Sequence, residues 1–212
     1  QNSFKSHFSF IKNACGANAF YAAPYDADAG ESVDTYLGSI QGNIKKGKWV
    51  IMPSIYSRYN EDHYVFIRSM PSIYENRHFT SSSGALLDFN RSNALGKLGG
   101  GLETRVETIH SNNLGVHQRY YTNGFLDQFW QYSKTGSITF GLNAQYNKFL
   151  GWSFFPGLDW KQKITKNTNV FANLGTGNRL ATFTELYYTD RANTSNDSLQ
   201  AERAQYVSLG IK

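Results

Sequence analysis

The sequence predicts an all-β fold: a segment of an antiparallel transmembrane β-barrel with about ten strands. The first observation is a repeated alternation of apolar and polar residues with period two, as in a strand whose two faces meet different surroundings. The second is that the connections between successive strands are short at one end of the sheet and mostly long at the other. Outer-membrane barrels combine these features, with short periplasmic turns and long extracellular loops.

The composition agrees with a barrel and argues against several other classes. The 212 residues include 14 Tyr and 15 Phe, and only 17% are charged, below the ~25% usual for soluble domains. No run of ~18 apolar residues occurs, so no transmembrane helix is expected, whereas a barrel strand needs only ~9–11 residues. The single cysteine, Cys15, rules out an internal disulfide. The net charge of +5 comes from scattered lysines and arginines without a recognition helix, so nucleic acid is not an expected partner.

Strand-like runs follow one another along the whole chain, each bounded by turn-forming residues. The third run places Trp49, Ile51 and Ile55 on one face. Pro53 shares that face, although a proline normally belongs to an edge strand or a bulge. The predicted strands are 5–14, 32–45, 48–59, 80–92, 96–109, 119–131, 136–147, 152–164, 168–176 and 200–212.

The fifth run, 96–109, separates charge from apolar character most clearly. One face carries Lys97, Glu103, Arg105 and Glu107, and the other face carries no charge. We therefore predict that these four side chains face the lumen of a barrel and that the leucines and valine between them face lipid.

The seventh and eighth runs repeat the alternation. The run 136–147 sets Phe140 and Leu142 against polar or small residues, and the run 152–164 does the same with Phe154. Their apolar rows are also expected to face lipid.

Connection lengths orient the predicted sheet. Successive connections between antiparallel strands lie at opposite ends. The short ones at one end are 45–48, 92–96, 132–136 and 164–168. Those at the other end are the long segments 15–31, 60–79, 110–118 and 177–199 and the short segment 148–151. The long end is expected to be extracellular.

Motifs of catalysis are absent from the sequence, and the chain is not expected to be an enzyme. Residues 42–48 nearly match a phosphate-binding loop, but Trp49 stands where a Ser or Thr would bind magnesium. The five histidines show no H-E-x-x-H spacing, and no G-x-S-x-G elbow occurs.

One connection offers ligands for a cation. Asp190, Asn193 and Asp197 supply the hard oxygen atoms that calcium prefers. The same residues also fit a solvated polar loop. Calcium in such loops is the one cofactor that the sequence brings into question, and no other is expected.

Two motifs near the C-terminal end carry a family resemblance. Residues 181–188 read Ala-Thr-Phe-Thr-Glu-Leu-Tyr-Tyr after Arg179, and residues 198–203 read Ser-Leu-Gln-Ala-Glu-Arg before the last strand. They resemble the late-barrel motifs of TonB-dependent outer-membrane receptors. Those motifs have proline at the two positions where this chain has Ala181 and Ala201. Further segments are similar to the cobalamin-transporter branch of the Bacteroidetes type: 16–21, 96–105, 111–115 and 155–159.

The resemblance implies a 22-stranded barrel with an N-terminal plug, located in the outer membrane of a Gram-negative bacterium. Residues 1–212 would be part of the barrel domain, with the plug and the remaining strands outside this chain. The family imports scarce nutrients with energy passed through TonB, and a corrinoid such as cobalamin is the first expectation here. A surface lipoprotein lid is a further expected partner, besides lipid. A siderophore or glycan receptor and a passive porin-type barrel stay open as alternatives.

Ligand contacts are expected from aromatic and basic residues in or beside the long connections, because such loops carry specificity on a rigid scaffold. Each residue also fits a packing or interfacial role. The candidates are Tyr64, Phe66, Arg68, Tyr120, Tyr121, Phe125, Tyr187, Tyr188 and Arg191.

Overall fold

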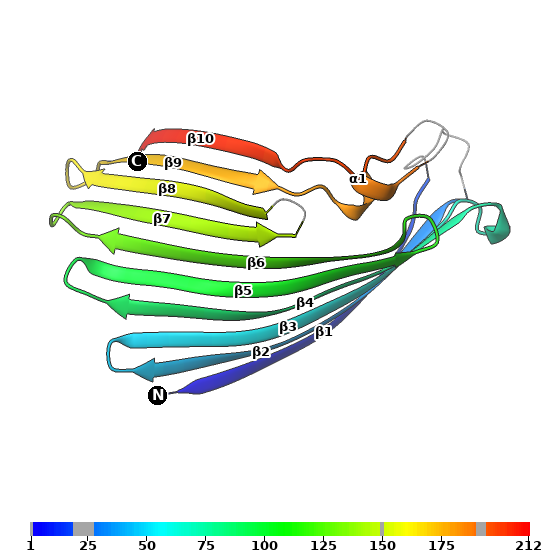
Figure 1. The fold of residues 1–212 in the computed structure, drawn as a ribbon, viewed down its shortest axis with the longest axis horizontal. Coiled ribbons are helices and arrows are strands. Elements are labelled where there is room, and N and C mark those ends of the chain that lie inside the picture. The colour runs from blue at the N-terminus through cyan, green and yellow to red at the C-terminus, as the bar shows by residue number, and fades with distance from the viewer. Residues whose placement is uncertain (1, 19–27, 149–150, 190–193) are drawn as a thin grey trace.

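The computed structural model describes residues 2–18, 28–148, 151–189 and 194–212. They form one 10-stranded antiparallel sheet in which every strand pairs with its neighbour in the sequence, as Figure 1 shows. The prediction of an all-β sheet of ten strands is confirmed. The strands are β1 (Ser3–Gly16), β2 (Gly30–Lys46), β3 (Trp49–Val65), β4 (Glu75–Ser92), β5 (Gly96–Ser111), β6 (Gly115–Trp130), β7 (Gly136–Asn147), β8 (Gly151–Lys163), β9 (Asn169–Arg179) and β10 (Glu202–Ile211).

Within the described residues, two short helical turns lie in the connections: η1 (Pro71–Ile73) between β3 and β4, and α1 (Phe183–Tyr187) between β9 and β10. In the part of the chain that is described, no helix has the length and apolar character needed to cross a membrane. The strands β1 and β10 lie at the two edges of the sheet, and they are the first and last strands in Figure 1.

At one end of the sheet, all connections are tight. The β2–β3 turn is two residues long and is made possible by Gly47, whose φ of +60° favours glycine. In the β4–β5 turn, the Asn93 side chain accepts hydrogen bonds from the backbone N–H groups of Leu95 and Gly96 at 3.1 and 2.9 Å. Residues 131–135 and 164–168 complete this end.

At the other end, two connections are shorter than predicted. The segment 110–118, expected to be long, is a three-residue turn at 112–114, because β5 and β6 stay paired up to Ser111 and Gly115. The apolar alternation fades there, but backbone hydrogen bonding does not depend on it. The β3–β4 connection, predicted as 60–79, is only 66–74, because β3 and β4 stay paired up to Val65 and Glu75. The connections between β1 and β2 and between β9 and β10 are long, as expected.

The register fixes which side chains share a face of the sheet. Leu102 lies opposite Leu87 on one side and Gly124 on the other, and Pro53 lies opposite Leu87. We call this the apolar face. Its large side chains are well exposed, as the following show: Phe4 72%, Phe8 77%, Ile55 57%, Leu102 55%, Leu126 52%, Phe140 50%, Trp152 60%, Phe154 61%, Val207 71% and Leu209 78%.

The opposite side, which we call the polar face, carries Glu103, Arg105 and Glu107 of β5 with their cross-strand neighbours. An exposed apolar surface that extends over ten strands far exceeds what a soluble monomer tolerates. The two faces therefore match lipid on one side and a hydrated interior on the other.

Substituting Leu102 by arginine tests this assignment of faces. We expect Leu102→Arg to lower the free energy of unfolding in lipid by about 2–4 kcal/mol, because a charge would enter hydrocarbon. Equilibrium unfolding of the full-length protein in bilayers is the measurement. The matched control is Leu86→Arg, one strand away and opposite Glu103 on the polar face, which is expected to be mild. A mild Leu102→Arg beside a severe Leu86→Arg would reverse the two faces.

Candidate ligand-binding surface

A chain of paired charges crosses the polar face. The Tyr56 hydroxyl of β3 donates to Glu103 of β5 at 2.6 Å, and Glu103 lies 3.4 Å from the Arg105 guanidinium. Arg105 is 3.0 Å from Glu107, which in turn is 2.6 Å from Arg119 of β6. Because anions and cations alternate, the charges of this row are largely neutralised within the wall itself.

Strand geometry explains this row. Residues 103, 105 and 107 point to one face because side chains alternate along a strand, and the register sets Arg119 directly opposite Glu107. Gly84 of β4 lies between Tyr56 and Arg105, and a Cβ there would stand 2.8 Å from the Tyr56 hydroxyl. The missing side chain at Gly84 therefore leaves the tyrosine room to reach Glu103.

The β9–β10 connection folds back onto β6, three strands away. Arg119 donates to the carbonyl oxygen of Ala181 at 2.7 Å, and its guanidinium lies 4.6 Å from the centre of the Phe183 ring. Next to it, the rings of His117 and Tyr187 are parallel, with centroids 3.4 Å apart. Arg119 thus links the charged row to the β9–β10 connection. A variant without this guanidinium would lose the contacts to both.

A second group of charges holds the base of the same connection. Arg179, at the end of β9, binds both carboxylate oxygens of Glu185 at 2.9 Å and those of Glu202 at 2.6 and 3.0 Å. Thr182 caps α1 by accepting from the Glu185 N–H, while Glu185 accepts from the Thr182 N–H. The Arg179 guanidinium and the Thr182 donors lower the pKa of Glu185 to about 2.

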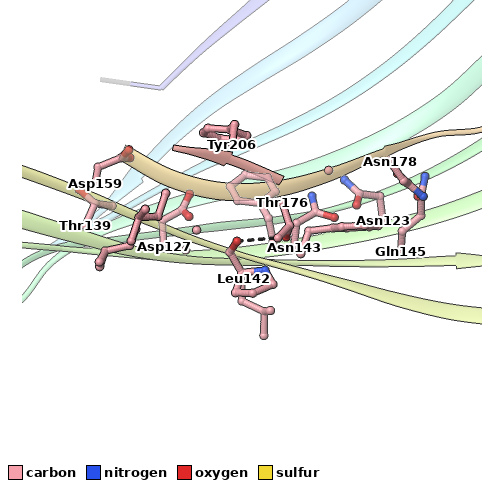
Figure 2. Close-up of a pocket in the computed structure, with 18 of the residues that line it drawn as sticks. Asn123, Asp127, Thr139, Leu142, Asn143, Gln145, Asp159, Thr176, Asn178 and Tyr206 are labelled. Atoms are coloured by element: carbon pink, nitrogen blue, oxygen red, sulfur yellow. Dashed lines mark hydrogen bonds between the residues drawn. The ribbon is translucent and has the colours of Figure 1, made fainter. Parts of the chain in front are cut away.

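A cavity of about 600 Å³ opens on the polar face along β5–β9, and Figure 2 shows the side chains that surround it. Four amide side chains belong to its lining. The Asn178 side chain donates to Gln145 at 3.0 Å, and Asn173 donates to Asp159 at 2.5 Å below it. Tyr206 of β10 lies over Gly175 at one side. The labelled polar residues of the lining are Asn123, Asp127, Thr139, Asn143, Gln145, Asp159, Thr176 and Asn178.

Glycines create the space for this cavity. Nothing lies within 4 Å of the position where a Cβ of Gly177 would stand, and Gly157 meets only a backbone oxygen at 3.8 Å. Gly141 lies under Asp127, whose carboxylate oxygen is 2.6 Å from that position. The floor is therefore backbone, and the amide side chains lie around it with the carboxylates of Asp127 and Asp159.

Two of the predicted ligand residues lie at this surface. Tyr121 is on the polar face, 4.6 Å beneath the Arg105 guanidinium, and Phe125 lines the cavity. Tyr120 points the other way: it is 60% exposed on the apolar face, because neighbours in a strand alternate. Tyr64 is 4% exposed and packs among loop residues, so its ring supports the loop rather than a ligand surface.

The remaining candidates are dispersed. Phe66 packs against the small cluster of Ala17, Ala29 and Tyr64, and Arg68 lies 3.4 Å from Asp28. Hydrogen bonds from Ser69 and the charge of Arg68 lower the pKa of Asp28. These residues organise the longer connections at the β1–β4 side of the sheet.

In the β9–β10 connection, Tyr187 stacks on His117, and Tyr188 is the C-cap residue that follows α1. Arg191 lies outside the described residues. Lys97 is at the tight-turn end of β5, opposite Ser92 and Phe129, and is exposed, away from the row formed by Glu103, Arg105 and Glu107.

The proposed calcium ligands are described only in part. Asp190 and Asn193 lie outside the described residues, and Asp197 accepts a hydrogen bond from Ser198 at 3.1 Å. Within the described ranges, no cluster of three His, Cys, Asp or Glu side chains is arranged to hold a metal. Calcium at this connection stays a prediction.

Sequence reasoning missed Arg119, Tyr56 and His117. The pairing of Arg119 with Glu107 follows from the β5–β6 hairpin, because a tight turn at 112–114 sets the two residues opposite each other. The prediction of a long connection at 110–118 gave no register between the two strands, so this pairing was not predicted. Tyr56 and Glu103 are two strands apart, and no local pattern reveals their contact.

Comparison with known proteins gives a fold but no family assignment. No family model matches the chain, and no curated protein matches it. Solved structures do match. The siderophore receptor PirA from Pseudomonas aeruginosa superposes with a TM-score of 0.75 at 13% identity, covering 86% of this chain and 37% of the receptor.

The hemophore receptor HasR of Serratia marcescens, solved with its hemophore HasA and heme, gives a TM-score of 0.78 at 12% identity and covers 98% of this chain and 39% of HasR. The ferric enterobactin receptor PfeA from Pseudomonas aeruginosa gives 0.74 at 12% identity, covering 85% of this chain and 32% of PfeA. This chain thus spans a third to two fifths of the receptors that it resembles. It has the fold of a wall segment of outer-membrane receptor barrels.

The contacts of Arg119 predict how firmly the β9–β10 connection is held. Arg119→Met removes the bond to Ala181 and leaves Glu107 with one cation fewer, so we expect amide exchange at 181–187 to become about tenfold to a hundredfold faster. Hydrogen exchange with mass spectrometry measures this. Arg203→Met on β10 is the control and should leave exchange there unchanged. Equal protection in both variants would show that Arg119 does not hold the connection.

The low pKa of Glu185 predicts an acid-sensitive segment. The carboxylate titrates at about 2 in the folded chain against 4.5 for a free glutamate, so its contribution is complete above pH 4.5 and is lost as the pH falls towards 2. We expect protection of the α1 amides to fall across this window. The Glu185→Gln variant should be less protected at neutral pH and should lack the acid step. An acid step that persists in this variant would assign it to another group.

Proposed function

We propose that this chain forms part of the wall of an outer-membrane receptor that imports a scarce nutrient into a Gram-negative bacterium. The likeness to solved siderophore and hemophore receptors supports this, together with the separation of an apolar face from a polar face. In this proposal the apolar face meets lipid, the polar face lines the lumen, and uptake draws on energy passed through TonB. A surface lipoprotein is a further proposed partner.

For the nutrient, we propose a corrinoid such as cobalamin. The observation that carries this choice is the amide-rich cavity along β5–β9, in which Asn123, Asn143, Gln145 and Asn178 present donors and acceptors. A corrin ring carries amide side chains around its edge, and amides pair with amides through both donor and acceptor atoms. Large ligands are fixed in such cavities by a few placed polar groups.

Charge weighs against a strongly anionic siderophore. Four charged residues line the cavity: one cation, Arg105, and three acids, Glu103, Asp127 and Asp159. A ferric tris-catecholate carries several negative charges and would be repelled by this surface. Siderophores of neutral or positive charge would not be repelled in this way. A receptor for such a siderophore is therefore the nearest alternative function, followed by a glycan receptor.

Calorimetric titration of the full-length protein with cyanocobalamin tests the nutrient. We expect binding at micromolar or lower concentration. Asn143→Leu keeps the size of the side chain and removes its amide, so affinity should fall about threefold to tenfold. Asn13→Leu on β1, at the other edge of the sheet, is the matched control and should bind as the parent does.

Other outcomes reassign the function. Heat with a ferric hydroxamate and none with cyanocobalamin would make the protein a siderophore receptor. A steady ion conductance across planar bilayers in the absence of any ligand would favour a passive porin. Equal affinity of both variants and the parent would remove the cavity from the binding site.

A further inference from the structure

A second pocket on the polar face, of about 290 Å³, lies beside the β9–β10 connection. Arg58 of β3 lines it, in a cross-strand row that continues through Ser82 and Glu107 to Arg119. Thr80 and Ser82 of β4 stand next to Arg58 on the same face, and Thr184 of α1 lines the pocket from the connection.

Arg58 differs from the other arginines of this row in having no counterion. Within the described residues its guanidinium forms no ion pair, whereas Glu107 is shared by Arg105 and Arg119 and Glu103 is taken by Arg105 and Tyr56. Arg58, Arg105 and Arg119 therefore place three guanidinium groups beside two carboxylates, those of Glu103 and Glu107. The surplus positive charge lies at Arg58, which is exposed to the pocket.

Hydroxyl groups complete the donor set. Among the residues described, the side chains of Thr80, Ser82 and Thr184 make no hydrogen bond to another group, so their O–H groups are free to donate into the pocket. A guanidinium fork with several hydroxyl donors is the arrangement that binds the oxygens of a phosphate group. The neighbouring acid, Glu107, is already neutralised by two arginines.

We propose that this pocket binds a singly charged phosphate ester of the imported molecule, with Arg58 as the group that recognises its charge. This rests on the proposed uptake function. For a corrinoid, the matching group is the phosphodiester that joins the ring to its lower nucleotide. The amide-lined cavity then holds the ring, and Arg58 distinguishes complete cobalamins from corrinoids that lack the nucleotide.

A comparison of two ligands tests this in the full-length protein. Arg58→Gln should weaken cyanocobalamin binding about tenfold or more, because a charged hydrogen bond is lost, and should leave binding of dicyanocobinamide, which has no phosphate, unchanged. Arg91→Gln, whose arginine lies 4.9 Å over Trp49 on the apolar face, is the control and should alter neither. Equal losses for both ligands, or no loss for either, would overturn the proposal.

Chemical labelling tests the pocket without any corrinoid. Inorganic phosphate should slow modification of Arg58 by phenylglyoxal severalfold, relative to chloride at the same ionic strength, and should not protect Arg91. Peptide mass spectrometry reads both sites in one sample. If the protein binds neither corrinoid but phosphate protects Arg58, the nutrient assignment fails and the phosphate site stands. If phosphate gives Arg58 no protection, the site is refuted whatever the corrinoids do.

Discussion

Backbone hydrogen bonding between neighbouring strands is the constraint on which this structure depends. Hydrocarbon offers no partner for an N–H or C=O group, so a chain that crosses it with strands must pair each strand along its length. All ten strands here are paired in sequence order without a crossover. The pleat of those strands then forces side chains to opposite faces, and each face acquires its own chemistry.

The polar face is shaped by a second constraint, which is the free-energy cost of burying charged side chains partly in the wall. Glu103, Arg105, Glu107 and Arg119 have side chains that are 17–30% exposed, and each is paired with a neighbour of opposite sign. Pairing across strands needs the correct register, so a tight turn at 112–114 is also an electrostatic device: it places Arg119 opposite Glu107. Arg58 lies beside these paired charges and, among the described residues, forms no ion pair of its own.

The sequence predicted most of the fold because alternation encodes the faces directly. The strand at 136–147 has the predicted bounds, since its polar and apolar residues alternate without interruption. The alternation fails near 110–118, where pairing continues between residues of mixed character, and the predicted loop was too long. The site was harder to predict: Tyr120 and Tyr121 were grouped by sequence, but they lie on opposite faces. Contacts such as Tyr56 with Glu103 depend on two registers at once.

Arg119 connects the two pockets of the polar face. It belongs to the charged row whose members Glu103 and Arg105 line the amide-rich cavity, and it also lines the pocket of Arg58. Through Ala181 and Phe183 it holds the β9–β10 connection, which supplies Thr184 to that second pocket. A ligand that displaces this connection must therefore break the contacts of Arg119 with Ala181 and Phe183. Selectivity at the pocket of Arg58 and order in the β9–β10 connection are accordingly coupled through the guanidinium group of Arg119.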